Sequence, residues 1–155
     1  MAGKMTSYEM DARVPLIVRV PGYRRGQCQG MVEFVDIYPT LCELAGITGG
    51  PELEGRSFVA LLENPRRKGK PAAFHQFLRE GIRVAPDGVE YMGYAIRTER
   101  HRHVEWRRWK DKTLAGRELY DLIEDPQENV NRVEEPGNEA LIRELSGRLK
   151  KGWRG

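Results

Sequence analysis

The chain has 155 residues, enough for one hydrophobic core of ordinary size or for a small domain joined to part of a larger one. Hydrophobic residues make up 39% and charged residues 32% of the sequence, which excludes wholesale disorder. The formal net charge is only +3, so the whole molecule is not a strong polyelectrolyte. No apolar run reaches the ~18 residues of a membrane-spanning helix, and the N-terminus has no apolar stretch typical of an export signal.

The first strong pattern is a compact run of β-branched and apolar residues, Val14–Val20, closed by Pro21 and Gly22. Such a run before a Pro-Gly pair predicts a buried strand followed by a turn. A strand of a larger sheet exposes unpaired backbone groups when its neighbours are missing. We therefore expect self-association through this edge.

Two helices are predicted in the next part of the chain. Apolar side chains recur at helical spacing from Val32 to Ile47. Pro39 favours a helix start near Tyr38, with Asp36 as its cap. Ser57 is placed to cap a second, short helix over 58–63.

The expected domain boundary is the basic stretch that follows Asn64 and Pro65 and contains both Gly and Pro. Residues 1–64 and residues 65–155 are accordingly assigned to different domains. Beyond the boundary, the hydrophobic period changes from that of helices to that of strands.

The second domain is predicted to be a sheet covered by one helix. Strands are expected over 73–78, 91–97, 103–107 and 118–122, and an amphipathic helix over 139–150. Residues 98–102 make the hairpin connection between the second and third strands. An antiparallel sheet packed with the C-terminal helix buries both apolar faces, so the predicted fold class is α+β.

The two cysteines, Cys28 and Cys42, lack the spacing and the neighbouring histidines of a zinc set, so we expect no metal site from them. Cys42 falls within the apolar helical pattern, where a free thiol serves as a small hydrophobe. The sequence leaves open whether the two are paired.

A basic run extends from Arg97 to Lys112, with seven Arg or Lys against three acidic residues. One interpretation is a solvated polar strand face. The other is a binding module that holds a sulfated glycan or a nucleic acid between cations and aromatic rings. No signature of a known nucleic-acid-binding fold accompanies the run.

Three segments carry a resemblance to a known family. They are G-K-M-T-S-Y-E at Gly3–Glu9, leading into V-P-L-I; V-D-I-Y-P-T-L with L-A-G-I at Val35–Ile47; and G-Y-A-I-R-T with E-L-Y-D-L and D-P-Q-E at Gly93–Glu128. In this order they resemble the C-terminal portion of a sulfatase of the iduronate-2-sulfatase-like kind, in the alkaline-phosphatase-like superfamily. The resemblance covers nearly the whole chain.

The resemblance implies that residues 1–64 are a fragment of an α/β alkaline-phosphatase-like fold and that the remainder is its small C-terminal subdomain. It implies a parent sulfuric ester hydrolase, exported (periplasmic or extracellular) or lysosomal, that acts on a sulfated saccharide with calcium and a formylglycine residue. The compartment of this chain itself stays unknown.

The chain contains no C/S-x-P/A-x-R segment, from which formylglycine is made, and the family's calcium-binding acids precede the G-K-x-T segment. We therefore expect no cofactor, no metal site and no complete catalytic site in this chain, and no activity of the chain alone. Its expected partner is the upstream catalytic half of the same sulfatase. One half of a split sulfatase is an alternative.

By the same resemblance, Lys4 corresponds to the lysine that contacts the substrate sulfate, where an ammonium group acts as a point charge. In the predicted hairpin, stacking and anion contacts to a sulfated saccharide are expected from Arg97, His101, His103 and Trp106. The alternative is that Trp106 is plain core and that the two histidines are exposed hairpin residues. Relatives are expected to carry Tyr-like residues at the two histidine positions, so the substrate preference is left open.

Overall fold

The computed structural model describes residues 6–50, 52–79 and 88–152, which form two compact units. One unit contains the described residues up to Pro15 together with Phe74 and the described residues that follow. The other unit is Leu16–Ala73. The compact units therefore divide after Pro15 and after Ala73, whereas the assignment of 1–64 and 65–155 to two domains of a parent enzyme stays a prediction.

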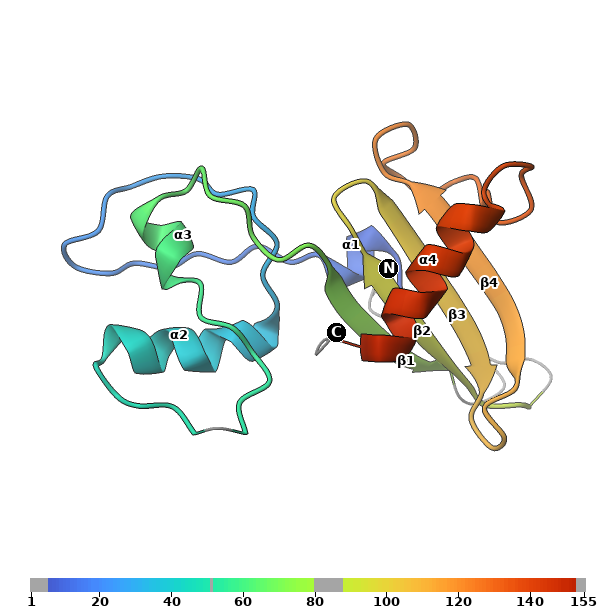
Figure 1. Cartoon of the computed structure of the whole chain (residues 1–155), viewed down its shortest axis with the longest axis horizontal. Coiled ribbons are helices and arrows are strands. Elements are labelled where there is room, and N and C mark those ends of the chain that lie inside the picture. The colour runs from blue at the N-terminus through green and yellow to red at the C-terminus, as the bar shows by residue number, and fades with distance from the viewer. Residues whose placement is uncertain (1–5, 51, 80–87, 153–155) are drawn as a thin grey trace. The chain divides into compact units, whose positions relative to one another are not determined.

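The first unit is a four-stranded sheet with a helix on one face. The strands lie in the order β1 (Ala73–Arg79), β2 (Tyr91–Arg97), β3 (His101–Arg108) and β4 (Leu114–Asp121). Pairing is antiparallel from β2 to β3 and from β3 to β4. The helix α4 (Glu139–Lys151) crosses one face, and the short helix α1 (Glu9–Ala12) lies on the other (Figure 1). The predicted α+β architecture of antiparallel sheet and C-terminal helix is confirmed.

The structure shortens the predicted hairpin between β2 and β3. The ladder extends to Arg97 and Arg102, which lie opposite each other, so that only residues 98–100 remain outside the strands. Thr98 closes the turn, because its backbone N–H donates to the carbonyl of His101 at 2.8 Å. Polar residues at strand ends can pair through their backbones alone, so hydrophobic alternation underestimates the length of strands.

Both faces of the sheet are buried. On the α4 face, Ile96 and Leu119 are 0% and 2% exposed, and the helix adds Leu145 at 1%. On the opposite face, Ala95, Val104 and Trp106 form a cluster against which Phe77 and Tyr91 pack. Because side chains alternate along a strand, neighbouring residues of β3 pack on opposite faces of the sheet.

The second unit contains a 3-10 turn, η1 (Phe34–Asp36), followed by helices α2 (Ile37–Leu44) and α3 (Val59–Glu63). The predicted helix start near Tyr38 is confirmed to within one residue. Asp36 precedes α2 as expected, but its side chain makes no capping hydrogen bond to that helix. The carboxylate instead accepts from the backbone N–H groups of Glu33 and Arg56, at 2.8 and 2.7 Å.

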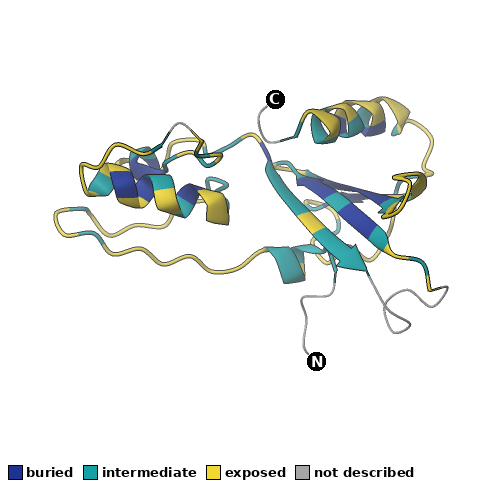
Figure 2. Ribbon diagram, turned by 90° about the horizontal axis from the view of Figure 1, so that it is seen from below, coloured by how far each residue is buried: buried dark blue, intermediate teal, exposed yellow. Residues whose placement is uncertain are grey.

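The predicted strand at Val14–Val20 is absent. This run carries no helix or strand, and Ile17 is 92% exposed. Figure 2 shows the stretch after α1 as a long exposed ribbon. A strand forms only where a neighbour pairs with its backbone, and none of the described residues pairs with this run. The sequence pattern was therefore insufficient by itself.

The state of the two cysteines and the character of the helices also bear on the sequence predictions. Cys28 and Cys42 are both free thiols, the first exposed and the second buried. Among the described residues, no helix combines the length and the apolar character needed to cross a membrane.

Candidate functional site

The four hairpin residues expected to contact substrate lie on two different faces of the sheet. Arg97 and Trp106 belong to the face covered by α1, because Arg97 lies opposite Arg102 and Trp106 follows Arg102 at an even spacing. His101 and His103 occupy the alternate positions and belong to the α4 face. The structure therefore does not bring the four side chains together in one patch.

His103 is a fully buried member of a polar network. Its side chain is 0% exposed, and Nδ1 donates to the backbone carbonyl of Glu118 at 2.9 Å. The hydroxyl of Ser146, from α4, lies 3.1 Å from Nε2 and donates to Oε1 of Glu105 at 2.8 Å. The interaction with the His103 side chain is the main cause that holds the pKa of Glu105 well below its usual range. Hydrogen bonds from Arg107 and Ser146 lower this pKa further. This network joins α4 to the sheet.

Trp106 is enclosed by partners from three other strands. Its indole N–H donates to Oε1 of Glu118 at 2.7 Å, and the guanidinium of Arg79 lies 4.1 Å from the centre of the ring. Gly93 lies opposite and leaves room for the ring. With only 9% of its surface exposed, Trp106 packs inside the unit.

Arg97 and His101 are the two expected residues that retain part of their surface. Arg97 lies 3.4 Å from a carboxylate oxygen of Glu9 and donates to the carbonyl of Glu99 at 3.0 Å. His101 lies 3.9 Å from Asp121, and burial is the main cause that lowers the pKa of the imidazole. Their side chains are 24% and 22% exposed.

A buried charge cluster that sequence reasoning missed lies beside Arg97. Arg102 is 1% exposed, forms ion pairs with Glu9 and Glu128, and donates to the carbonyl of Ser7. The backbone N–H of Glu9 also donates to Glu128, at 2.6 Å. Burial raises the pKa of Glu128, against the opposite effects of the Glu9 N–H and the Arg102 guanidinium. The cluster therefore ties the N-terminal segment to the sheet.

An aromatic pair holds the same segment. The rings of Tyr8 and Tyr120 meet edge to face, with centroids 5.7 Å apart, and their hydroxyl groups are 3.4 Å apart. Burial raises the pKa of Tyr120, so this phenol stays protonated. The residues from Ser7 to α1 are thus held by the charge cluster and by an aromatic contact.

A sequence signal for the charge cluster was present. Arg102, Val104 and Trp106 occupy alternate positions of one strand, so Arg102 falls on an inward face. An inward arginine needs buried acidic partners. The two acidic partners lie far along the chain on either side, Glu9 at 93 residues before Arg102 and Glu128 at 26 residues after it, which only the fold reveals. Lys4, the expected sulfate contact, lies outside the described residues.

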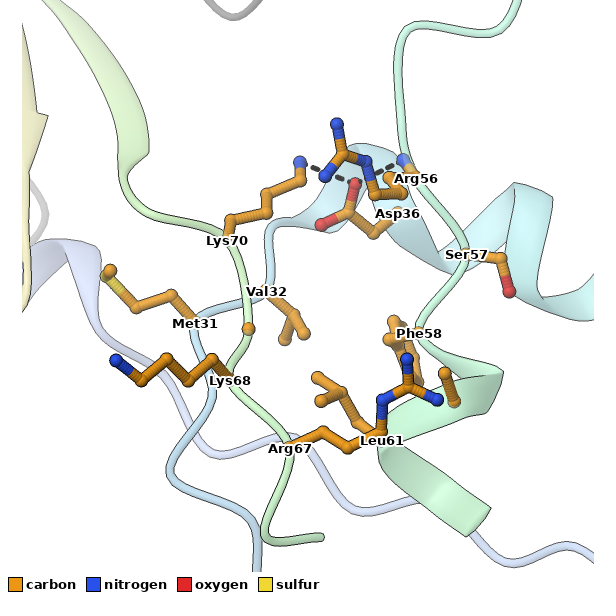
Figure 3. Close-up of a pocket in the computed structure, with 12 residues that line it drawn as sticks. Met31, Val32, Asp36, Arg56, Ser57, Phe58, Leu61, Arg67, Lys68 and Lys70 are labelled. Carbon is orange, nitrogen blue, oxygen red and sulfur yellow. Dashed lines mark hydrogen bonds and ion pairs between the residues drawn. The ribbon is translucent and has the colours of Figure 1, made fainter. Parts of the chain in front are cut away.

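The second unit contains a cavity of about 190 Å³ (Figure 3). Its lining combines apolar side chains, including Val32, Phe58 and Leu61, with cationic ones. The ammonium of Lys70 binds Asp36 and Glu33, each at 2.6 Å. Asp36 is therefore a buried structural acid rather than a free catalytic carboxylate.

The remaining cations around this cavity, Arg56, Arg67 and Lys68, do not converge on one point. Figure 3 shows Lys68 extending away from Arg67. Within the described ranges, no group of three or more His, Cys, Asp or Glu side chains is placed to hold a metal ion. Neither cysteine stands in a formylglycine motif.

Comparison with protein families gives a match over almost the entire chain. The model described as N-sulphoglucosamine sulphohydrolase, C-terminal, covers residues 2–154. Arylsulfatase K of Mus musculus is 33% identical over 132 residues, which are 83% of this chain and 23% of that protein. Arylsulfatase K of Homo sapiens is also 33% identical over 132 residues, 83% of this chain and 24% of that protein. The chain thus spans about a quarter of the length of these relatives.

Solved structures share the fold. One protein, solved in complex with its substrate D-glucosamine-2-N,6-O-disulfate, has a TM-score of 0.61 at 22% identity, covering 77% of this chain and 23% of that chain. Another, described in connection with the metabolism of multiple glycosaminoglycans by Bacteroides thetaiotaomicron, has a TM-score of 0.60 at 23% identity. It covers 88% of this chain and 30% of that chain.

Proposed function

Because this chain belongs to the family of N-sulphoglucosamine sulphohydrolase C-terminal regions, we propose that it is the C-terminal region of a sulfatase of the iduronate-2-sulfatase-like kind. In this proposal it supports the catalytic sheet and shapes the substrate pocket of a sulfuric ester hydrolase. The formylglycine nucleophile and the calcium ligands belong to the upstream catalytic half, and the chain alone does not hydrolyse sulfate esters.

The observation that carries this proposal is the exposed apolar surface of the second unit. Along α2 and the turn before it, Phe34, Tyr38 and Leu41 are 72%, 61% and 57% exposed. Tyr38 and Leu41 are three residues apart, which places them on one side of α2, and Phe34 precedes them in η1. Ile17, at 92%, adds to the exposed apolar residues of this unit. Exposed apolar side chains that concentrate in one short segment support a protein interface there.

The partner proposed for this surface is the upstream catalytic half, and the substrate of the assembled enzyme is a sulfated saccharide. Relatives four times as long as this chain support the first part. In the assembled enzyme, we assign the sulfate contact to Lys4, and further substrate contacts to Arg97 and His101, the expected hairpin residues with exposed surface. His103 and Trp106 would act on the site only by holding the sheet in place.

The test is complementation. The chain is produced alone and together with an upstream sulfatase region that contains the C/S-x-P/A-x-R segment, and hydrolysis of an aryl sulfate is measured with calcium present. We expect turnover only from the combination. Calcium-dependent hydrolysis by the purified 155-residue chain alone would refute the proposal.

The apolar surface is tested with Tyr38→Lys and Leu41→Lys, which keep good helix formers in α2. Both variants are expected to reduce complementation at least tenfold, because a charged group would be buried at the interface. Ile123→Lys is the matched control, since Ile123 is 67% exposed in the other unit. Equal loss in all three variants would contradict an interface at α2. Self-association of the chain alone, expected above through a strand edge at Val14–Val20 that does not form, is proposed instead through this surface and is measured by sedimentation.

A further inference from the structure

The fold divides the basic run into two parts with different surroundings. In the first part, residues 97–107, all four arginines form ion pairs with carboxylates: Arg97 with Glu9, Arg100 with Asp121, Arg102 with Glu9 and Glu128, and Arg107 with Glu105. These charges are neutralised within the first unit. The capacity of the run to attract an anion therefore lies in its second part.

That second part is the turn between β3 and β4, Arg108–Lys112, which we call the basic turn. Arg108, Lys110 and Lys112 are all exposed, and none forms an ion pair in the part of the chain that the structure describes. Asp111, the acid of the turn, accepts a hydrogen bond from the backbone N–H of Thr113 at 2.9 Å. The basic turn therefore presents a local excess of positive charge to solvent.

Hydrogen bonds fix the shape of the basic turn. Arg108 N–H donates to the carbonyl of Thr113, and Lys112 N–H donates to that of Arg108, each at 2.9 Å. Trp109 N–H donates to the carbonyl of Glu90 at 2.9 Å. Lys112 takes a left-handed backbone conformation, with φ at 60°. A ligand that binds here does not have to order the loop, which lowers the entropic cost of binding.

An aromatic ring lies among these cations. Trp109 is 43% exposed, and the ammonium of Lys112 lies 3.5 Å from the centre of its ring. An indole ring offers a flat apolar surface for the C–H face of a pyranose, while arginine and lysine bind the oxygens of sulfate groups. Because the Lys112 ammonium lies over one face of the indole, the exposed remainder of Trp109 is the surface that a sulfated sugar would contact, next to this cation.

We infer that the basic turn binds a sulfated glycan through Trp109, Arg108, Lys110 and Lys112. A glycan is favoured over a nucleic acid, because the turn has one aromatic residue, and single-stranded nucleic acids stack successive bases on several rings. The choice of a sulfated polymer rests on the proposed function, but binding at this turn does not require catalysis.

The experiment measures binding of the 155-residue chain to three probes: a heparin octasaccharide, the same octasaccharide after complete desulfation, and single-stranded DNA of matching charge. The triple variant Arg108→Gln/Lys110→Gln/Lys112→Gln and the single variant Trp109→Ala are compared with Arg143→Gln/Lys150→Gln/Lys151→Gln. This control removes the same charge from exposed positions of α4. Circular dichroism verifies that all variants fold.

We expect the heparin octasaccharide to bind, with affinity that falls as salt rises, and the desulfated octasaccharide not to bind. The triple variant should weaken binding at least about tenfold and Trp109→Ala about threefold, against less than about threefold for the control. Equal losses in the triple variant and the control, no binding of heparin at low salt, or equally tight binding of DNA would each overturn the inference. Because no turnover is measured, failure here leaves the complementation result intact.

Discussion

Gly93 lies directly opposite Trp106 in the pairing of β2 with β3, and a Cβ atom at Gly93 would stand 2.6 Å from the indole ring. Gly116 of β4 also lies opposite Trp106, on its other side, yet a Cβ atom there would meet nothing within 4 Å. The two glycines therefore differ in what they leave room for. Only Gly93 makes space for the ring.

Gly93→Ala is expected to lower the free energy of unfolding by about 1–3 kcal/mol, because the ring must move within a packed face. Gly116→Ala should change it by less than about 0.5 kcal/mol. Urea unfolding followed by tryptophan fluorescence measures both. Equal effects of the two substitutions would show that the contact with Trp106 is not the cause.

Arg102→Met is expected to be the most damaging single substitution in the charge cluster. It leaves the carboxylates of Glu9 and Glu128 without their buried cation, which costs about 3–5 kcal/mol. Amides of α1 should also exchange faster with solvent, because the segment loses its attachment to the sheet. Thermal unfolding and hydrogen exchange provide the measurements.

The matched control for that substitution is Arg148→Met, at an arginine that pairs with exposed Glu144 on α4 at 3.7 Å. Its expected cost is below about 1 kcal/mol. Adding Glu128→Leu to Arg102→Met should recover part of the lost stability, since one uncompensated charge is removed. A double variant less stable than Arg102→Met would contradict this account of the cluster.

Asp121 provides a pH dependence of defined sign. Hydrogen bonds from Arg100, at 2.8 and 2.6 Å, are the main cause that lowers the pKa of Asp121 to about 2. Because this lies below the ordinary value of about 3.9, the ionised carboxylate adds stability above pH ~4 that is lost as the pH falls through ~2. Arg100→Gln should raise the pKa of Asp121 toward the ordinary value, so that the loss begins at higher pH.

Carbon chemical shifts of the Asp121 carboxyl, followed from pH 1.5 to 6, measure this pKa in the wild type and in Arg100→Gln. The control is Asp125, whose pKa is lowered mainly by the backbone N–H of Val130. It should titrate identically in both proteins. An unchanged pKa of Asp121 in the variant would mean that backbone donors, and not Arg100, hold it down.

The two cysteines should differ in reactivity. Cys28 is exposed and Cys42 is buried in α2, and both are free. A thiol reagent is expected to modify Cys28 in the folded protein and Cys42 only when denaturant is added, because burial excludes the reagent. Mass spectrometry of the labelled protein distinguishes them. Comparable labelling of both without denaturant would contradict a packed second unit.

The hydrophobic pattern of neighbouring residues predicted β2 and α4 correctly. β2 has the predicted bounds because its residues form a nearly continuous apolar run, and α4 differs from the predicted helix by one residue because its apolar residues recur at helical spacing. The same reasoning failed at Val14–Val20, where the composition was that of a strand. A strand needs a neighbour, and its hydrogen bonds are not local.

In the candidate site, too, the sequence identified residue types but not their tertiary surroundings. The sequence identified Arg97, His101, His103 and Trp106 as chemically capable residues, but it could not say that alternation along β3 sends His103 under α4 and Trp106 to the other face. Nor did it indicate which cations of the basic run were already paired. Ser146 and Glu9, which occupy polar groups of β3, come from distant parts of the chain.

The sequence by itself determined that the chain belongs with sulfatase C-terminal regions and that its second half is a sheet with one helix, since ordered motifs and hydrophobic periods are properties of neighbouring residues. Only the tertiary structure decided that Arg102 joins Glu9 and Glu128 inside the first unit, and that the basic turn keeps its charges exposed. Glu9 and Glu128 are 119 residues apart. Burial and ion pairing depend on which distant segments meet, and that is fixed by the packing of the whole fold.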